Sequence, residues 1–245
     1  MRLFLNESGD PKGPVVVLLH AFPMSAEMWQ PQLEALKGFR VLAPDLRGFG
    51  GTALTAPWLV EHAAADVLES FAGPAVFVGL SMGGYVALQI AASAPDRVKG
   101  LVLCDTRAEA DANENKAKRA AAIDFVRANG VDAFLGPFLK DAVHAQSAAG
   151  FLRGVAAKSK PEAVLAALAA LAARPDQTPN LPKIKAPACV IVGSQDKITP
   201  LPLSEAMRSK IPGAELHLIP DAGHFSNAEN PAAFNERLVS FLRRL

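Results

Sequence analysis

Three side chains in this sequence could together make a serine into a nucleophile. Ser81 is the central residue of a Gly-Leu-Ser-Met-Gly motif at residues 79–83. A serine hydroxyl reacts poorly near neutral pH, so it needs a base to take its proton and an acid to hold that base in the correct tautomer. His224 is the candidate base and Asp196 the candidate acid. The chemistry of such a set is acyl transfer through a covalent intermediate.

The residues around Ser81 predict a sharp turn between a strand and a helix. The apolar run at residues 75–79 predicts a buried strand, and residues 82–94 predict a helix that ends before Pro95. A serine on such a turn has strained backbone geometry, so its neighbours two residues away on either side must lack bulk. Gly84 is expected to let the helix approach the sheet. The serine would also lie at a helix N-terminus, where free N–H groups favour negative charge on a bound substrate.

Four other histidines compete with His224 for the role of base. His224 follows the last predicted strand, in a loop from which its side chain could reach the serine. His217 lies inside that strand, and His62 and His144 are expected in polar helical surroundings, so we interpret these three as structural or solvated. His20 ends the first buried strand. We interpret it as a neutral hydrogen-bonding residue that shapes the next loop, and a role as base is the alternative.

Two aspartates could orient the base. Asp196 follows the apolar run at residues 188–193 and precedes a turn into a helix. Asp105 ends the run at residues 98–104 and could also reach the histidine, so it remains a rival. Asp45 ends a third run, but we expect it to brace a tight turn together with Arg47.

Short aliphatic runs alternate with helical segments along most of the chain. Buried strands are predicted at residues 15–20, 40–44, 75–79, 98–104, 188–193 and 215–219, and a C-terminal helix at 231–245. This alternation predicts an α/β fold, with a mostly parallel β-sheet flanked by helices on both faces. Arg2–Asn6 is expected to add an antiparallel edge strand, with residues 9–13 as a turn.

The alternation stops between residues 106 and 182. Helices are predicted there at residues 111–129, 131–139, 147–157 and 161–173, with no convincing strand among them. We therefore predict a core formed by residues 1–105 and 183–245, with residues 106–182 as a helical cap. The alternative is that these helices cover the sheet directly, although usual connections are much shorter than this segment.

Composition excludes several classes of protein. Half of the 245 residues are hydrophobic, a fifth are charged and the formal net charge is +1. Scattered basic residues argue against nucleic acid or a membrane surface as partners, and no apolar stretch is long enough to span a bilayer. Cys104 and Cys189 lie in apolar runs and are expected as buried thiols. We expect a cytoplasmic protein that acts on a small molecule without a metal or cofactor. The oligomeric state is not predicted.

Five motifs in order resemble those of the α/β-hydrolase superfamily over essentially the whole chain. They are His20 to Pro23, Asp45 to Gly50, the motif around Ser81, Gly193 to Asp196 with Pro200, and Gly223-His224 followed by Glu229 and Pro231. The resemblance implies that Ser81, Asp196 and His224 form a catalytic triad and that residues 106–182 cap the active site. The order Ser, Asp, His is also the one expected for this fold, which favours Asp196 over its rival.

The first motif also implies an oxyanion hole. Ala21 stands where the family usually has glycine. The donors are expected to be the N–H groups of Phe22 and Met82, because Pro23 has no N–H to give. The side chains of Phe22 and Met82 would then face the substrate, with ordinary packing as the alternative.

A serine at position 81 argues against haloalkane dehalogenase or epoxide hydrolase chemistry, for which the relatives use aspartate there. The chain looks most similar to bacterial carboxylesterases and enol-lactone hydrolases. We expect a carboxylesterase-type serine hydrolase for small or medium esters, in which Phe134 and Phe138 of the cap line the substrate pocket or pack cap helices together. The alternatives are a lactone or carbon–carbon bond hydrolase, a perhydrolase, and a ligand receptor.

Overall fold

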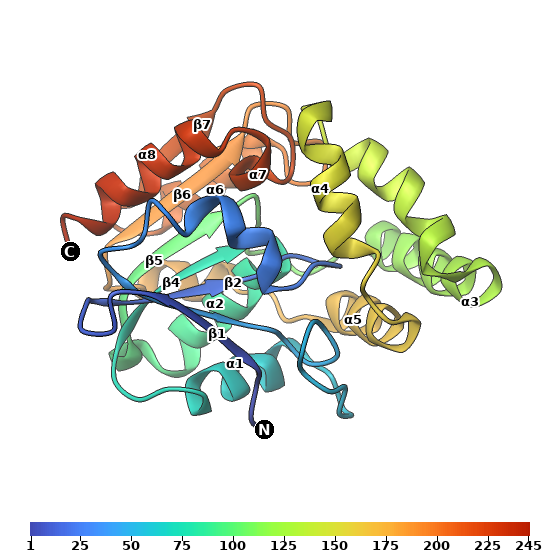
Figure 1. The fold of residues 1–245 in the computed structure, drawn as a ribbon, viewed down its shortest axis with the longest axis horizontal. Coiled ribbons are helices and arrows are strands. Elements are labelled where there is room, and N and C mark those ends of the chain that lie inside the picture. The colour runs from blue at the N-terminus through green and yellow to red at the C-terminus, as the bar shows by residue number, and fades with distance from the viewer.

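A seven-stranded sheet runs through the centre of the molecule (Figure 1). The computed structural model describes all residues from 1 to 245. The strands lie in the order β1-β3-β2-β4-β5-β6-β7, and β1 pairs antiparallel with β3 whereas every other pairing is parallel. The strands are β1 (Leu5–Gly9), β2 (Val15–Leu19), β3 (Arg40–Pro44), β4 (Ala75–Leu80), β5 (Val98–Cys104), β6 (Ala188–Gly193) and β7 (Glu215–Ile219). The predicted mostly parallel sheet is confirmed.

The first strand is the one strand whose predicted position was wrong by several residues. We expected it at Arg2–Asn6, but β1 pairs with β3 from Leu5 to Gly9. It is an edge strand whose side chains are half-buried or exposed, so backbone hydrogen bonds set its register. An apolar run therefore gives no signal for its position.

Helices cover both faces of the sheet. In Figure 1, α1 (Val60–Glu69) and α2 (Met82–Ser93) lie below the sheet, and α8 (Pro231–Leu242) lies above it. The short helices are α7 (Ser226–Glu229) and the 3₁₀ turns η1 (Ala26–Gln32), η2 (Pro95–Arg97) and η3 (Thr178–Lys183). The remaining helix of this part, α6 (Leu201–Lys210), packs against β6 and β7.

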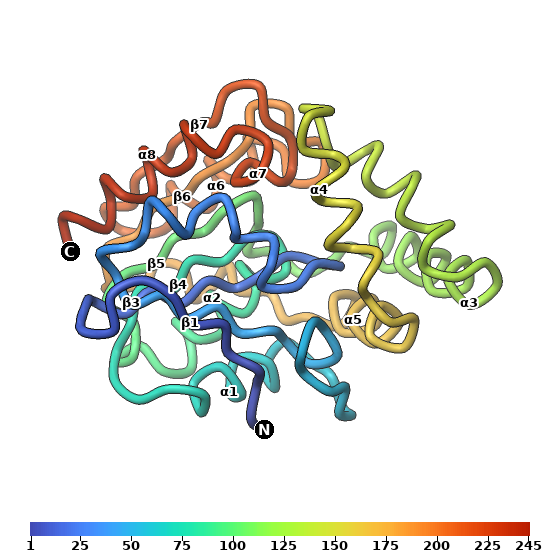
Figure 2. Tube along the Cα trace, viewed as in Figure 1, coloured from blue at the N-terminus to red at the C-terminus, as the bar shows by residue number.

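Three helices between β5 and β6 form the helical insertion, which Figure 2 shows gathered beside one end of the sheet. They are α3 (Asn113–Ala142), α4 (Gln146–Ala156) and α5 (Pro161–Ala173). The backbone of Gly130 is not helical (φ 82°, ψ 171°), so α3 consists of two arms that correspond to two predicted helices. The second arm extends to Ala142, three residues beyond its predicted end. That residues 106–182 act as a separate cap stays a prediction.

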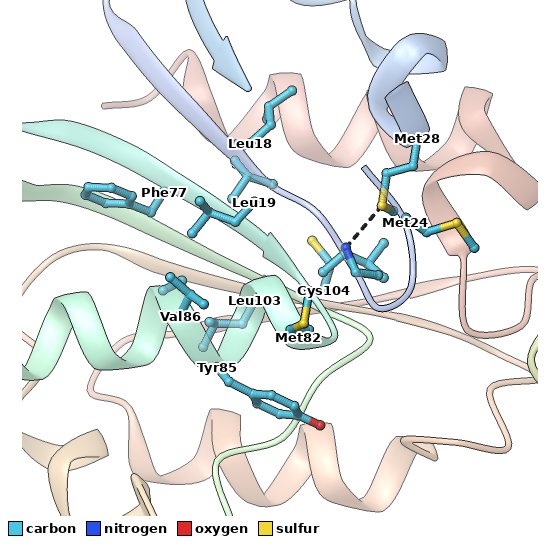
Figure 3. Close-up of a cluster of buried hydrophobic side chains, with 14 of the residues drawn as sticks. Leu18, Leu19, Met24, Met28, Phe77, Met82, Tyr85, Val86, Leu103 and Cys104 are labelled. Atoms are coloured by element: carbon cyan, nitrogen blue, oxygen red, sulfur yellow. Dashed lines mark hydrogen bonds between the residues drawn. The ribbon is translucent and has the colours of Figure 1, made fainter. Parts of the chain in front are cut away.

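The core beneath the sheet edge is closely packed. Leu19 of β2, Phe77 of β4 and Leu103 of β5 are completely buried, and Figure 3 shows them beside Val86 of α2. Burying one such side chain stabilises a fold by about 1.5–3 kcal/mol, so these side chains stabilise the strands that end at the site. Cys104 and Cys189 are buried free thiols, as predicted. No helix has both the length and the apolar character needed to cross a membrane.

Candidate active site

Ser81 occupies the strained turn that the sequence predicts. It follows β4 directly, precedes α2, and has φ 53° and ψ −111°. A non-glycine residue in this region costs about 1–3 kcal/mol, which the surrounding structure must offset. Two hydrogen bonds hold the turn: the Ser81 N–H donates to the Cys104 carbonyl (2.9 Å), and the Thr106 hydroxyl donates to the Ser81 carbonyl (2.8 Å).

Two glycines make this turn sterically possible. A Cβ atom at Gly79 would lie 2.3 Å from the carbonyl oxygen of Gly83. A Cβ atom at Gly83 would lie 2.0 Å from the carbonyl oxygen of Leu19, in the neighbouring strand. Both separations are shorter than any real contact of a Cβ atom, so any side chain at either position would displace the serine.

His224 connects the serine to a carboxylate. Its Nε2 atom lies 2.8 Å from Ser81 Oγ, and its Nδ1 atom lies 2.9 Å from Asp196 Oδ2. The three residues follow β4, β7 and β6, whose carboxyl ends share one edge of the sheet. The histidine is 1% exposed and Asp196 is 5% exposed. The structure thus brings the three predicted residues into one hydrogen-bonded row.

Asp196 is surrounded by donors. Its Oδ1 atom accepts from the N–H groups of Ile198 (2.8 Å) and Thr199 (3.0 Å), and its Oδ2 atom accepts from the Thr199 hydroxyl (2.6 Å). Burial alone would raise the pKa of this carboxyl, but His224 and these donors outweigh burial and lower the pKa to about 2. An ionised Asp196 only accepts hydrogen bonds, so Nδ1 of His224 carries its proton and Nε2 is free to accept from Ser81.

The lowered pKa of Asp196 predicts a pH-dependent stability. Its ordinary pKa is 3.8, so the folded protein gains stability from the ionised form above about pH 4 and loses it as the pH falls through about 2. We expect the difference in unfolding free energy between wild type and Asp196→Asn to change by about 2 kcal/mol from pH 5 to pH 2, with wild type losing more. Urea unfolding measures this difference. Parallel pH curves for the two proteins would contradict it.

The rival acid Asp105 has other partners. Its Oδ1 atom accepts from the Gly193 N–H (2.8 Å), and its Oδ2 atom accepts from the Ser226 hydroxyl. Burial, together with the nearby charge of Asp196, raises the pKa of Asp105 well above its ordinary value. No hydrogen bond joins it to His224, so the geometry gives the place beside the histidine to Asp196.

His20 has the contacts of a neutral imidazole. Its Nδ1 atom lies 2.9 Å from the Ala21 carbonyl and donates to it, because Nε2 accepts from the Leu46 N–H at 3.0 Å. Burial lowers the pKa of His20, which favours the neutral form. Both ring nitrogens are therefore used in fixing the loops after β2 and β3, in agreement with our interpretation.

The expectations for His144 and Arg47 need correction. His144 is not helical: it lies exposed in the linker between α3 and α4. Asp45 does brace a turn, accepting from the N–H groups of Ala26 (2.8 Å) and Gly51 (2.9 Å). Arg47 is not its partner, because the guanidinium pairs with Asp66 of α1. The Asp66 carboxylate, although distant in the sequence, lies closer to the Arg47 guanidinium than the carboxylate of Asp45 does.

The Phe22 N–H group, in the loop after β2, is unpaired. The Ala21 N–H donates to the Met28 sulfur (3.2 Å), as the dashed line in Figure 3 shows, and the Met24 N–H donates to the Ala21 carbonyl (2.9 Å). Pro23 has no N–H, and the Phe22 N–H makes no hydrogen bond within the chain. The N–H of Met82, at the start of α2, is also unpaired. The two expected oxyanion donors are thus both free to bind a ligand.

The three predicted pocket residues line one cavity of about 500 Å³. The ring centroid of Phe22 lies 6.2 Å from that of Phe134 and 5.9 Å from that of Phe138. The Phe138 ring also contacts Phe225 (6.5 Å), which in turn contacts the His224 ring (5.6 Å). Phe22, Phe134 and Phe138 therefore pack on one another and also form an apolar wall of the cavity, and Phe225 connects this wall to the His224 ring.

Glu229 is a site residue whose role sequence reasoning missed. Its Oε2 atom accepts from the N–H groups of His144 (2.7 Å), Ala145 (2.7 Å) and Gly223 (3.0 Å), and its Oε1 atom accepts from the Phe225 N–H (3.1 Å). The loop that carries the histidine is thereby bound to the linker between α3 and α4. Thr199 was missed too, although an aspartate followed by a threonine three residues later is a recognisable turn pattern.

One group of side chains could hold a metal ion. Ligand atoms of Cys189, Glu215 and His217 lie within 4.8 Å of one another, on β6 and β7. However, burial raises the pKa of the Cys189 thiol to about 12, and Arg244 binds the Glu215 carboxylate at 2.6 and 2.7 Å. This donor set therefore suits a structural ion pair better than a metal.

A serine beside a histidine occurs on many folds, but here it stands on a strand-to-helix turn at the carboxyl edge of a mostly parallel sheet. That combination defines the class of α/β hydrolases. The Alpha/beta hydrolase family matches residues 16–237, and the chain belongs to this family.

Individual relatives cover nearly the whole chain. A protein of Variovorax paradoxus (strain S110) that is named as a carbamate hydrolase, RutD, is 32% identical over 261 aligned residues, covering 100% of this chain and 97% of its own. A thermophilic esterase from Thermogutta terrifontis superposes with a TM-score of 0.92 at 35% identity, covering 99% of this chain and 93% of its own. The enol-lactonase from Burkholderia xenovorans LB400 superposes with a TM-score of 0.90 at 30% identity, covering 98% and 96%.

Proposed function

We propose that this protein is a carboxylesterase-type serine hydrolase that cleaves small or medium carboxylic esters through an acyl-enzyme on Ser81. The observation that carries the proposal is the hydrogen-bonded row, in which His224 lies 2.8 Å from the serine hydroxyl and 2.9 Å from an ionised Asp196. This is the geometry that a base needs in order to take the proton of a nucleophile.

The reaction follows from the geometry in two half-reactions. Ser81 Oγ attacks the ester carbonyl while its proton passes to Nε2 of His224, and the free N–H groups of Phe22 and Met82 bind the oxyanion. The tetrahedral intermediate expels the alcohol, which takes the proton from the histidine. Water then attacks the acyl-enzyme, gives a proton to His224, and the acid leaves as Ser81 regains its hydrogen. Asp196 stays ionised throughout and stabilises the imidazolium.

We further propose that Phe22, Phe134 and Phe138 line the acyl pocket and that residues 106–182 act as its cap. A cavity of about 500 Å³ is within the range for small-molecule sites. The similar esterase of Thermogutta supports an ester substrate. The similar enol-lactonase of Burkholderia supports the alternative, a lactone substrate, which has the same reacting carbonyl. The relative named for carbamate hydrolysis adds carbamates to the substrates to be compared.

The proposal is tested by the fate of a common acyl-enzyme. Phenyl butyrate and p-nitrophenyl butyrate should give the same butyryl-enzyme, so added methanol should divide the product between butyric acid and methyl butyrate in one ratio for both substrates. Gas chromatography measures the two products. A ratio that depends on the leaving group would contradict a shared intermediate. An enol-lactone turned over far faster than every ester would establish the alternative.

A further inference from the structure

The cavity beside the row has an unusual concentration of positive charge. Four cationic residues line it, with Asp141 as the single anionic one; the cations are Arg107, Lys118, Arg119 and Lys197. The whole chain carries a formal net charge of only +1. The excess of positive charge is therefore a local property of this cavity.

The nearest carboxylates do not neutralise these cations. Asp111, whose side chain is fully buried, is shared by Arg119, Arg107 (3.2 Å) and Arg174 (2.7 Å). Arg107 also keeps a buried Nε atom without a hydrogen-bond partner. One carboxylate thus faces three guanidinium groups, two of which line the cavity.

The two lysines add to the excess. Lys118 pairs with Glu114 at 2.7 Å on the exposed side of α3, where such a pair contributes little. Lys197 is exposed and forms no ion pair, and neither does Asp141. With Arg174 and these pairs included, five cations face three carboxylates. The side chains of Arg107 and Arg119 are only 16% and 19% exposed, so an anion beside them would be favourable. The two exposed lysines add longer-range attraction for that anion.

The rest of the cavity suits a hydrocarbon chain. Its apolar wall consists of Phe22, Ala122, Phe134, Phe138, Leu168 and Ile198. Ser81 and His224 do not line the cavity themselves, but two wall residues connect it to the site: Phe22 carries a proposed oxyanion donor, and the Ile198 N–H donates to Asp196. The cationic residues belong to the first arm of α3 and to the loops after β5 and β6. A ligand that fits both parts has an apolar chain with a negatively charged group.

We infer that the substrate of this site is an ester or lactone whose acyl chain carries a carboxylate away from the scissile bond. The carboxylate would lie among Arg107, Lys118, Arg119 and Lys197, and the methylene chain would lie against the phenylalanines. This inference rests on the proposed function, because it assigns the substrate class of the same site.

Two substrates of equal acyl length test the inference. Monomethyl adipate carries a terminal carboxylate that methyl hexanoate lacks, and methanol release gives kcat/KM for each. We expect wild type to prefer the adipate ester by about 5-fold or more at low ionic strength, and the preference to shrink as salt is added. Lys197→Gln should lower the ratio of the two kcat/KM values by about 2-fold to 5-fold, and Asp141→Asn should raise it.

A lysine outside the cavity is the matched control. Lys210 is exposed on α6 and forms no ion pair, so Lys210→Gln makes the same change in net charge and should leave the ratio at its wild-type value. A ratio near one in wild type, or an equal change in the Lys197 and Lys210 variants, would overturn the inference and leave the esterase proposal intact.

Direct binding separates this inference from the proposed function. Calorimetry should show adipate binding to the protein more tightly than hexane-1,6-diol, and less tightly to Lys197→Gln. Adipate binding without turnover of any ester would overturn the hydrolase proposal and support an anion site. Turnover of both esters, with no preference for adipate over the diol in binding, would support the hydrolase proposal and overturn the inference of a carboxylate-bearing substrate.

Discussion

Ser81→Ala is expected to lower kcat/KM on p-nitrophenyl esters by about 10⁴-fold or more, with the fold unchanged. The substitution removes only Oγ, the atom 2.8 Å from His224 Nε2, and keeps the Cβ atom that fits the turn. The other candidate nucleophiles, Cys104 and Cys189, are buried thiols whose pKa values are raised by burial, so they cannot replace the serine. Steady-state kinetics and circular dichroism check the two parts of this expectation.

A fluorophosphonate probe gives an independent readout of the same residue. It should label wild type and Ser209→Ala, in which an exposed serine on α6 is changed, but not Ser81→Ala. Peptide mapping identifies the labelled residue. Labelling elsewhere, combined with full turnover by Ser81→Ala, would refute the assignment of the nucleophile.

Asp196→Asn is expected to lower kcat by about 10⁴-fold, as removal of the orienting carboxylate does in other serine hydrolases. The amide would donate toward Nδ1 of His224, and the histidine would then carry its proton on Nε2, where it cannot accept one from Ser81. Asp105→Asn makes the same chemical change at the end of the neighbouring strand and is the matched control.

Asp105→Asn should retain kcat within about tenfold of wild type. An amide there can still accept from the Gly193 N–H and can donate to the Ser226 hydroxyl, so both existing contacts have a replacement. Urea unfolding must show that both variants are folded. If Asp105→Asn were the more damaging of the two folded variants, the orienting acid would be Asp105.

The parts of the site that depend on local chain geometry were predictable from the sequence. Gly79 and Gly83 around Ser81 indicated the turn because no larger side chain fits there. The strands that precede Asp196 and His224 both begin and end where predicted. The prediction that both are buried was wrong for β7, an edge strand that is mostly half-buried. Because the carboxyl ends of parallel strands meet at one edge of a sheet, the strand positions were enough to predict that these residues lie close together.

The parts that depend on contacts across the fold were not predictable in the same way. Arg47 pairs with Asp66 rather than with Asp45, because α1 crosses beside the loop after β3. Two of the four hydrogen bonds of Glu229 reach residues 84 and 85 positions earlier in the chain. No periodicity or short motif predicts contacts over such distances in the chain. For the same reason, the pairing of Asp111 with three arginines and the residues that line the cavity could not be predicted from the sequence.

The linker between α3 and α4 has a mechanical consequence for the insertion. The His224 N–H donates to the Ala142 carbonyl (2.8 Å), and Glu229 binds the next part of the linker, so displacing the linker would break several bonds at once. Bonds to a buried carboxylate are each worth about 1.5–3 kcal/mol, which makes such an opening a rare event at room temperature. The first arm of α3, residues 113–129, comes before Gly130 and makes no such hydrogen bond to the histidine loop. Gly130 thus divides the helix into an inner arm whose end is hydrogen-bonded to the histidine loop and an outer arm whose nearest anchor is the pair of Arg119 with Asp111.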